Sequence, residues 1–361
     1  MNRKVKKRKL LKGEKVSEVK RKLQLIGLDN LIWVLVIFIV LINSIFVPKF
    51  LSSRNLINIF YHSSSLALLV LGQGIVLIAG QIDLSIESTL AFAPGVAILL
   101  CNSLFPGTNA IIQIVLTLII GMIVGLANGL LITQLKMSPL LETLSANIIL
   151  RGLVLFLLPF SITKLSPGYT FAGSARTFGN IPVALLVLFG FFSAFMFIMH
   201  KTRFGRFLIA TGGNSRASYI AGINVNRMVI YSFVISGLLA ASAGILTVGR
   251  QGIVSNQMGS GLAIMSIAGA ILGGVALSGG KGIVFGMLGG VVLLSIFDNS
   301  LNLLAVNVYL IAVVRGLLIL FAIIMDSFKT NIRISILQKE KLKMLTEKIQ
   351  KSIKPGMQTT E

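Results

Sequence analysis

Long apolar stretches separated by short polar or glycine-rich segments run along almost the whole chain. Leu31–Ile42, Ile111–Leu131 and Ile181–Met199 contain no charged residue at all. The hydrocarbon core of a bilayer is about 30 Å thick, and a helix needs about 20 apolar residues to cross it. Because these runs cross or nearly cross that distance, the pattern predicts an all-α, polytopic membrane protein.

About ten segments of this kind follow one another, alternately directed inward and outward. They are Leu28–Val47, Asn55–Gly80, Asp83–Cys101, Ala110–Thr133, Leu140–Leu158, Ile181–His200, Met228–Val248, Leu262–Leu277, Ile283–Phe297 and Leu303–Met325. An even number of spans puts both termini on one side, which we expect to be the cytoplasmic side.

The span count divides the chain into three parts: a basic N-terminal tail at 1–27, a transmembrane domain at 28–326 and a basic C-terminal tail at 327–361. The first tail is compatible with a basic amphipathic helix lying on the membrane. It is too long and too charged for a cleaved signal peptide, so we expect 28–47 to be a retained span.

Composition supports this class of protein. Apolar residues make up 55% of the chain and charged residues 12%, and the mean hydropathy is +0.91. The net charge is +22, but most Lys and Arg residues lie in the two tails and in segment 201–227. All three lie on the side that the span count makes cytoplasmic, as the positive-inside rule requires. The charge therefore favours anionic lipid, rather than nucleic acid, as a partner.

Segment 201–227 is a basic island between two apolar blocks, with five Lys and Arg residues and no acidic residue. Within it, Asn214–Gly222 predicts one short helix, because Asn214 or Ser215 is a favourable N-cap. A capped, glycine-framed helix on the cytoplasmic side is suited to docking a soluble partner. On composition alone, an ordinary cytoplasmic loop is the alternative.

Ionisable residues inside spans are costly and mark functional sites by default. They are Asp83, Glu87, Glu142, Arg151, Asp298 and Arg315. Asp83, at the start of a span, is expected to cap that helix, with contact to a substrate as the alternative. Arg151 and Arg315 need partners inside the membrane, which Asp298 or the asparagines beside it can supply.

A path for a neutral polyol would be lined by hydrogen-bonding side chains. The predicted path residues are Gln73, Asp83, Ser85, Glu87, Asn147, Asn299 and Asn302. The uncharged ones can instead bond to a neighbouring helix, which is the more common use of polar residues in spans. Separately, Gly121, Gly125 and Gly129 are spaced four apart and predict close packing of their helix on a neighbour.

Motifs for catalysis and nucleotide binding do not occur in the chain. Ser278–Gly282 lacks the leading Gly and the final Ser/Thr of a P-loop, and no protease or hydrolase motif is present. Cys101 is the only cysteine, and the two histidines are far apart in sequence. We therefore expect no catalytic residue, no metal site and no enzymatic activity.

Five segments carry a resemblance to a known family. They are QIDLSIES at Gln81–Ser88, GLANG at Gly125–Gly129, Arg151-Gly152, GRFLIATGGNSRASYIAGINV at Gly205–Val225 and AGAILGGVALSGGKG at Ala268–Gly282. Together they resemble the membrane permease of bacterial ABC sugar importers of the ribose type, from about Leu28 to Asp326. The chain departs from the family pattern at Gln81 and Glu87, where glycine is usual, and at Ala263 and Met265, in a segment that usually carries acidic residues.

The resemblance implies a permease dimer, of two copies or of two related chains, in the bacterial plasma (inner) membrane. It also implies cytoplasmic ABC ATPase subunits, which bind the ATP and magnesium, and an extracytoplasmic solute-binding protein. This chain itself would bind no cofactor. The short helix within 201–227 would be the coupling helix that docks into the ATPase. The implied coupling residues are Gly213, Asn214, Arg216, Ala217, Tyr219, Ala221 and Gly222.

We thus predict import of a monosaccharide such as ribose, or of a similar small neutral solute, driven by ATP hydrolysis in a partner subunit. Movement of the coupling helix would tilt the spans and alternate access to a path near the dimer axis. Two alternatives stay open. One is a related permease for nucleosides or branched-chain amino acids. The other is a stand-alone secondary transporter, with coupling ions at Asp83, Glu87 or Asp298.

Overall fold

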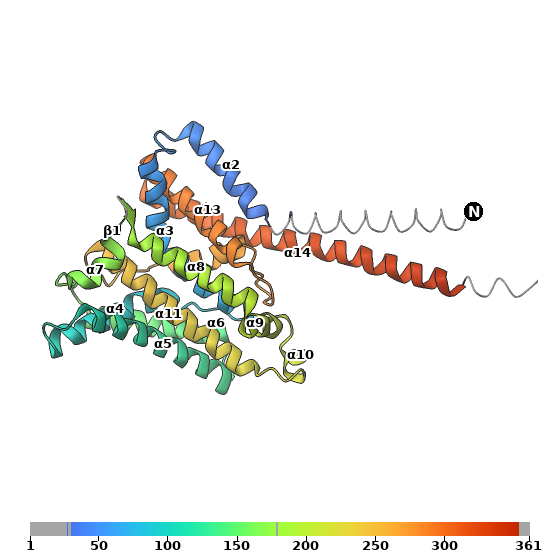
Figure 1. Ribbon diagram of the computed structural model, residues 1–361, viewed down its shortest axis with the longest axis horizontal. Helices are drawn as coiled ribbons and strands as arrows, with labels where there is room; N and C mark the ends of the chain where they lie inside the picture. The colour runs from blue at the N-terminus through green and yellow to red at the C-terminus, as the bar shows by residue number, and fades with distance from the viewer. Residues whose placement is uncertain (1–26, 28–29, 178–179, 354–361) are drawn as a thin grey trace, which may run out of the picture. The chain divides into compact units, whose positions relative to one another are not determined.

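The computed structural model describes residue 27, residues 30–177 and residues 180–353 (Figure 1). Contacts divide the chain into two units, one of residues 32–322 and one formed by the two ends, 1–31 and 323–361. The amphipathic helix expected at 1–27 lies outside the described residues, except for residue 27. In the second unit the described C-terminal part is helical as far as Ile353.

Helices account for most of the described residues, as predicted. In chain order they are α2 (Leu31–Phe46), α3 (Ser53–Ile78), α4 (Ile86–Leu104), α5 (Ala110–Gln134), α6 (Pro139–Leu157), α7 (Pro167–Ser174), α8 (Val183–Lys201), α9 (Arg203–Gly213), α10 (Ser215–Ile220), α11 (Val225–Gln251), α12 (Leu262–Leu272), α13 (Val284–Leu303) and α14 (Val308–Ile353). Two short strands, β1 (Arg176–Thr177) and β2 (Ile181–Pro182), pair antiparallel with Arg176 opposite Pro182.

Eight helices of the described chain are long and apolar enough to cross a membrane. They are α3, α4, α5, α6, α8, α11, α13 and the part of α14 up to Lys329. The helices α2 and α12 are apolar but shorter, with 16 and 11 residues. The all-α polytopic architecture is therefore confirmed. The total of about ten spans, the cytoplasmic position of both termini and the domain division at 326–327, which α14 crosses without a break, stay predictions.

Helix α3 lies at the centre of the larger unit, in contact with α11, α12 and α13. Every residue from Ser63 to Ile78 is buried, so this helix is covered on all sides. Such coverage requires small residues where neighbouring backbones approach. A Cβ at Gly72 would lie 3.3 Å from the Cα of Ser236, and one at Gly74 only 2.6 Å from the side chain of Met287. The centre of the unit is thus close-packed through glycine.

The glycine stripe of α5 packs against α11, which confirms the prediction from its spacing. A Cβ at Gly121 would lie 2.4 Å from the carbonyl oxygen of Gly237, and one at Gly125 would lie 2.2 Å from that of Phe233. No real Cβ comes so close to a backbone oxygen, so only glycine permits this helix separation. The two backbones meet directly over two turns.

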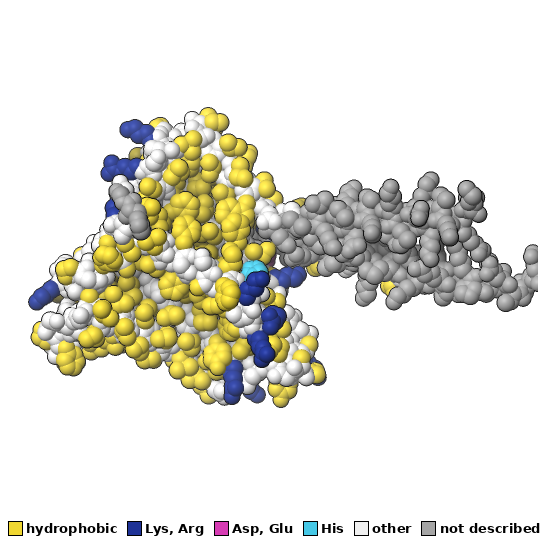
Figure 2. Space-filling model, viewed as in Figure 1, with side chains coloured by type: hydrophobic (Ala, Val, Ile, Leu, Met, Phe, Trp, Pro, Cys, Tyr) yellow, Lys and Arg dark blue, Asp and Glu magenta, His cyan; other side chains and the backbone are white. Residues whose placement is uncertain are grey.

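Large apolar side chains cover the outer surfaces of α5, α6 and α8. Ile148 and Phe156 of α6 are 65% and 80% exposed, and Phe197 of α8 is 64% exposed. Figure 2 shows hydrophobic side chains over most of the visible face of the larger unit, with Lys and Arg near its ends. Such a surface suits lipid, because apolar side chains facing water would be unfavourable.

Four segments differ from the sequence prediction. Helix α4 begins at Ile86 rather than at 83, and α12 ends at Leu272, where the left-handed Gly274 (φ +90°) turns the chain. The polar cluster 298–302 lies in the last turns of α13 rather than in a turn between helices. Segment 159–180, which lies between two of the predicted spans, contains α7. Its Tyr169 is fully buried, with its hydroxyl 3.0 Å from that of Thr117.

Candidate functional site

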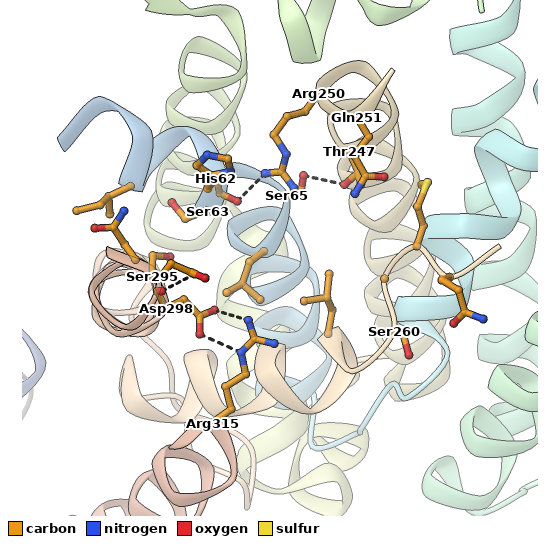
Figure 3. Close-up of a pocket in the computed structure, with 18 of the residues that line it drawn as sticks. His62, Ser63, Ser65, Thr247, Arg250, Gln251, Ser260, Ser295, Asp298 and Arg315 are labelled. Carbon is orange, nitrogen blue, oxygen red and sulfur yellow. Dashed lines mark hydrogen bonds and ion pairs between the residues drawn. The ribbon is translucent and has the colours of Figure 1, made fainter. Parts of the chain in front are cut away.

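A polar cavity of about 620 Å³ lies between α3, α11, α13, the start of α14 and the loop at 252–261 (Figure 3). The polar residues that line it are His62, Ser63 and Ser65 of α3; Thr247, Arg250 and Gln251 of α11; Ser255, Gln257 and Ser260 of the loop; Ser295, Asp298, Asn299 and Asn302 of α13; and Arg315 of α14. Its volume is in the range of small-molecule pockets.

Helical spacing explains why these residues converge. On α13 the lining positions are 295, 298, 299 and 302, which fall on one face of a helix. The same spacing recurs at 59, 62, 63 and 66 on α3, and at 247, 250 and 251 on α11. The lining positions of α11 and α13 are polar throughout, whereas those of α3 combine His62 and Ser63 with Ile59 and Leu66. That periodicity was the signal in the sequence that would have identified the cavity.

Both arginines of the cavity have acceptors. Arg315 donates from Nε and Nη2 to the two oxygens of Asp298, at 2.9 and 3.1 Å. Arg250 donates to the backbone oxygen of His62 at 2.8 Å. A hydroxyl–hydroxyl bond of 2.9 Å joins Thr247 to Ser65 across the α11–α3 boundary (Figure 3). The cavity thus offers one ion pair, one arginine bonded to a backbone carbonyl, hydroxyl groups and amides, which can all form hydrogen bonds with a polar solute.

Of the predicted path residues, the structure places only Asn299 and Asn302 in this cavity. Asn299 also exchanges two hydrogen bonds with the side chain of Asn55, at 3.0 and 3.1 Å. Gln73 is completely buried in α3, and neither atom of its amide has a hydrogen-bond partner among the described residues.

Asp83 and Ser85 belong to a buried network between α4, α5 and α11. The carboxylate of Asp83 accepts from the amide of Ser85 at 2.9 Å, from its hydroxyl at 2.6 Å and from the hydroxyl of Ser236 at 2.7 Å. The Ser85 hydroxyl in turn accepts from Asn128 at 2.8 Å. Asp83 thus bonds the backbone that enters α4, in agreement with the capping prediction, although Ser85 occupies the N-cap position.

Glu87 and Asn147 lie in a second cluster with Arg151, beside the loop at 252–261. Glu87 accepts from the amide of Asn147 at 3.4 Å and from the backbone amide of Ala263 at 3.1 Å. Arg151 lies 4.0 Å from Glu87, whereas the sequence pointed to the neighbourhood of Asp298 for its partner. The prediction that Asp298 or a neighbouring asparagine is the partner of both arginines is therefore confirmed for Arg315. It is wrong for Arg151.

The short helix α10 confirms the local prediction. Asn214 is its N-cap, with the side-chain oxygen accepting from the amide of Ala217 at 2.9 Å. All seven implied coupling residues are exposed, as is Ile220. Tyr219 and Ile220 are 74% and 78% exposed, so two large apolar side chains project from a polar segment. Such a pair is suited to insertion in a partner's groove.

A glycine junction joins the α9–α10 corner to the centre of the unit. It consists of Gly80, Gly212, Gly279 and Gly280. The amide of Gly280 donates to the carbonyl oxygen of Ile78, the last residue of α3, at 2.9 Å. A Cβ at Gly212 would lie 1.8 Å from that same oxygen. The end of α9 therefore rests directly on the end of α3 and on the turn that precedes α13.

Comparison with known proteins identifies the family. The model of the family described as "Branched-chain amino acid transport system / permease component" matches residues 55–323. The chain belongs to this permease family. The match includes the cavity, the α10 segment and the glycine junction. No solved structure matches.

Several curated relatives of the permease are named as sugar import permeases. It is 35% identical to the ribose import permease protein RbsC of Bacillus subtilis over 294 residues, which are 81% of this chain and 90% of that one. The Escherichia coli K12 protein of the same name is 33% identical, covering 78% and 88%. The galactose/methyl galactoside import permease protein MglC of Salmonella typhimurium is 32% identical, covering 78% and 89%.

Proposed function

We propose that this permease is the transmembrane subunit of an ABC importer in the bacterial plasma membrane, and that it imports a monosaccharide or a similar small neutral solute. The observation that carries this is the identity of 32–35% to ribose and galactose import permeases over most of both chains. The ATP is bound and hydrolysed by a partner subunit, and an extracytoplasmic binding protein delivers the solute. A second permease copy, or a related chain, completes the membrane part.

The polar cavity supports a neutral solute. Among the described residues that line it, the carboxylate of Asp298 is paired with Arg315, and Arg250 donates to a backbone carbonyl oxygen. Most of the other polar lining groups are hydroxyls and amides. A sugar offers many hydroxyl groups that both donate and accept, so it can bond to each of these. The cavity then serves as part of the translocation path. This includes Asn299 and Asn302 from the predicted path.

The α10 segment supports coupling to an ATPase. Its exposed Tyr219 and Ile220 give the docking contact, and Arg216 beside them faces solvent. The glycine junction supplies the mechanical link, because α9 cannot move toward α3 without displacing the carbonyl group of Ile78. Helix α3 ends just before the junction and α13 begins just after it, and both helices carry residues that line the cavity. A displacement of α10 is thus transmitted to α3 and α13, which line the cavity.

Reconstitution tests the proposal. The permease, its ATPase and its binding protein are placed in proteoliposomes, and uptake of labelled ribose is measured with and without ATP. We expect uptake that requires ATP, the ATPase and the binding protein together. Vesicles that contain the permease alone and take up solute with a proton gradient would instead establish a secondary transporter.

Branched-chain amino acids are a second candidate class of solute, because the matched family is described as a branched-chain amino acid transport system. Competition in the same vesicles separates the two. Unlabelled galactose or ribose should compete with the labelled sugar, whereas leucine and adenosine should not. Competition by leucine alone would assign the permease to amino acids.

A further inference from the structure

The loop at 252–261 forms one wall of the cavity and has little regular structure of its own. It contributes Ser255, Gln257 and Ser260 to the lining. Three of its glycines, at 252, 259 and 261, have φ between +71° and +80°. A segment of this kind is held mainly by contacts from outside itself.

Arg151 of α6 supplies two of those contacts. Its Nη1 donates to the backbone oxygens of Asn256 and Met258, both at 3.0 Å. Both acceptors are main-chain atoms, so the guanidinium holds the path of the backbone. Of the two side chains, Met258 lines the cavity, whereas the Asn256 amide donates to the backbone oxygen of Leu158 at 3.2 Å. The Nη2 of Arg151 faces Glu87 at 4.0 Å.

Glu87 of α4 fixes the end of the same loop. Its Oε2 accepts from the amide of Ala263, in the first turn of α12, at 3.1 Å. The N-cap residue of α12, Gly261, has no side chain with which to accept that bond. A carboxylate at a helix start also complements the positive end of the helix dipole. Glu87 therefore caps α12 from another helix.

If Glu87 and Arg151 served only to stabilise the fold, an ion pair would not be needed at this place. Replacing an ion pair in an apolar environment by well-packed apolar residues is often neutral or stabilising. In this chain each member of the pair bonds to the backbone of the cavity wall. Gly259 of that wall lies so close to α4 that a Cβ would be 2.5 Å from the carbonyl oxygen of Glu87.

We propose that Glu87 and Arg151 are positioning residues for transport. They hold the 252–261 loop and the start of α12 in the position where these segments form one wall of the solute cavity. The inference rests on the proposed function, since it takes the cavity as part of the path. Loss of either residue displaces this wall while the α13 wall opposite stays in place. Solute then passes less efficiently for each ATP hydrolysed.

Cysteine accessibility tests the wall directly. Cys101 is the only cysteine, so Cys101→Ala gives a background without reactive thiols. Ser260→Cys reports on the loop and Asn302→Cys on α13, and both positions are exposed and line the cavity. The rate of labelling by a water-soluble maleimide is measured in the full complex, in vesicles without solute or ATP.

Glu87→Gln and Arg151→Gln should each raise the labelling rate at position 260 by about fivefold, which corresponds to the loss of about one hydrogen bond. Labelling at 302 should stay within about twofold. The matched control is Ser145→Ala on α6, and it should change neither rate. Within the part of the chain that the structure describes, the Ser145 hydroxyl bonds only to the backbone oxygen of Leu141 in its own helix. An unchanged rate at 260, or an equal rise at both positions, would overturn the proposal.

The amount of solute imported per ATP hydrolysed is a second measurement, and it distinguishes loss of positioning from loss of folding. In Glu87→Gln we expect solute imported per ATP to fall about fivefold while the ATPase rate stays within about twofold. The double variant Glu87→Gln/Arg151→Gln should be no worse than either single one, because the two act on one wall. Equal loss of uptake and ATPase activity, or additive losses, would make the pair merely structural. If instead the unaltered complex takes up no sugar with ATP, the proposed function fails, while the labelling result keeps its meaning.

Discussion

Arg315 of α14 and Asp298 of α13 face each other in the cavity through two parallel hydrogen bonds of 2.9 and 3.1 Å. The pair balances charge at a place where the solute is expected to pass. Its side chains are 45% and 27% exposed, so water screens them only in part. Each residue keeps the other from presenting an unpaired charge to a neutral solute.

Breaking this pair should impair transport. In Asp298→Asn the guanidinium of Arg315 loses its ionic partner, and we expect sugar uptake to fall about tenfold. Uptake in reconstituted vesicles is the measurement. The exchanged variant Asp298→Arg/Arg315→Asp restores the pairing in reverse and should recover part of the activity. Full activity in Asp298→Asn would show that the pair does not act on the solute.

Filling the glycine junction should uncouple the permease. Gly212→Ala places a Cβ where it would be 1.8 Å from the oxygen of Ile78, so the end of α9 must shift. We expect solute imported per ATP to fall about tenfold, a coupling change on the order of 1–2 kcal/mol. The control is Gly190→Ala in α8, where nothing lies within 4 Å of the added atom. Normal coupling in Gly212→Ala would remove the junction from the mechanism.

The exposed apolar pair of α10 should be needed for binding the ATPase. Tyr219→Ala/Ile220→Ala removes two side chains that pack on little of this chain, so folding should be retained. Affinity for the ATPase, measured with purified components, should fall about thirtyfold, as for interface residues that contribute about 2 kcal/mol. Tyr309→Ala removes a tyrosine of similar exposure (82%) on α14 and should have no effect. Undiminished binding would place the docking contact elsewhere.

The glycine stripe of α5 should be essential for stability. Gly125→Ala would put a Cβ 2.2 Å from the carbonyl oxygen of Phe233, and the α5–α11 contact must open. Overpacking of this kind costs about 1–3 kcal/mol, which thermal unfolding in detergent will detect. Gly152→Ala in α6 has nothing within 4 Å and should leave the unfolding temperature unchanged or slightly raised. Equal stability of the two variants would contradict the packing argument.

Local features were predictable because they depend on neighbours in the sequence. The N-cap hydrogen bond of α10 joins Asn214 to Ala217, only three positions further along the chain. The spacing of Gly121, Gly125 and Gly129 showed that a helix packs closely there, but could not show that α11 is the partner. Residues 298–302 fall between two predicted spans, and their helical periodicity with Ser295 becomes visible only because α13 continues to Leu303.

Hydropathy, charge asymmetry and short motifs are local properties, so the residue pattern was enough to predict an all-α membrane protein, the capped helix α10 and the resemblance to sugar permeases. Only the tertiary structure decided which polar residues meet. Asp83 bonds to Ser236 across 153 positions, and Glu87 reaches Ala263 across 176. Several helices can satisfy a buried polar group equally well, and the choice between them depends on how their backbones pack against one another.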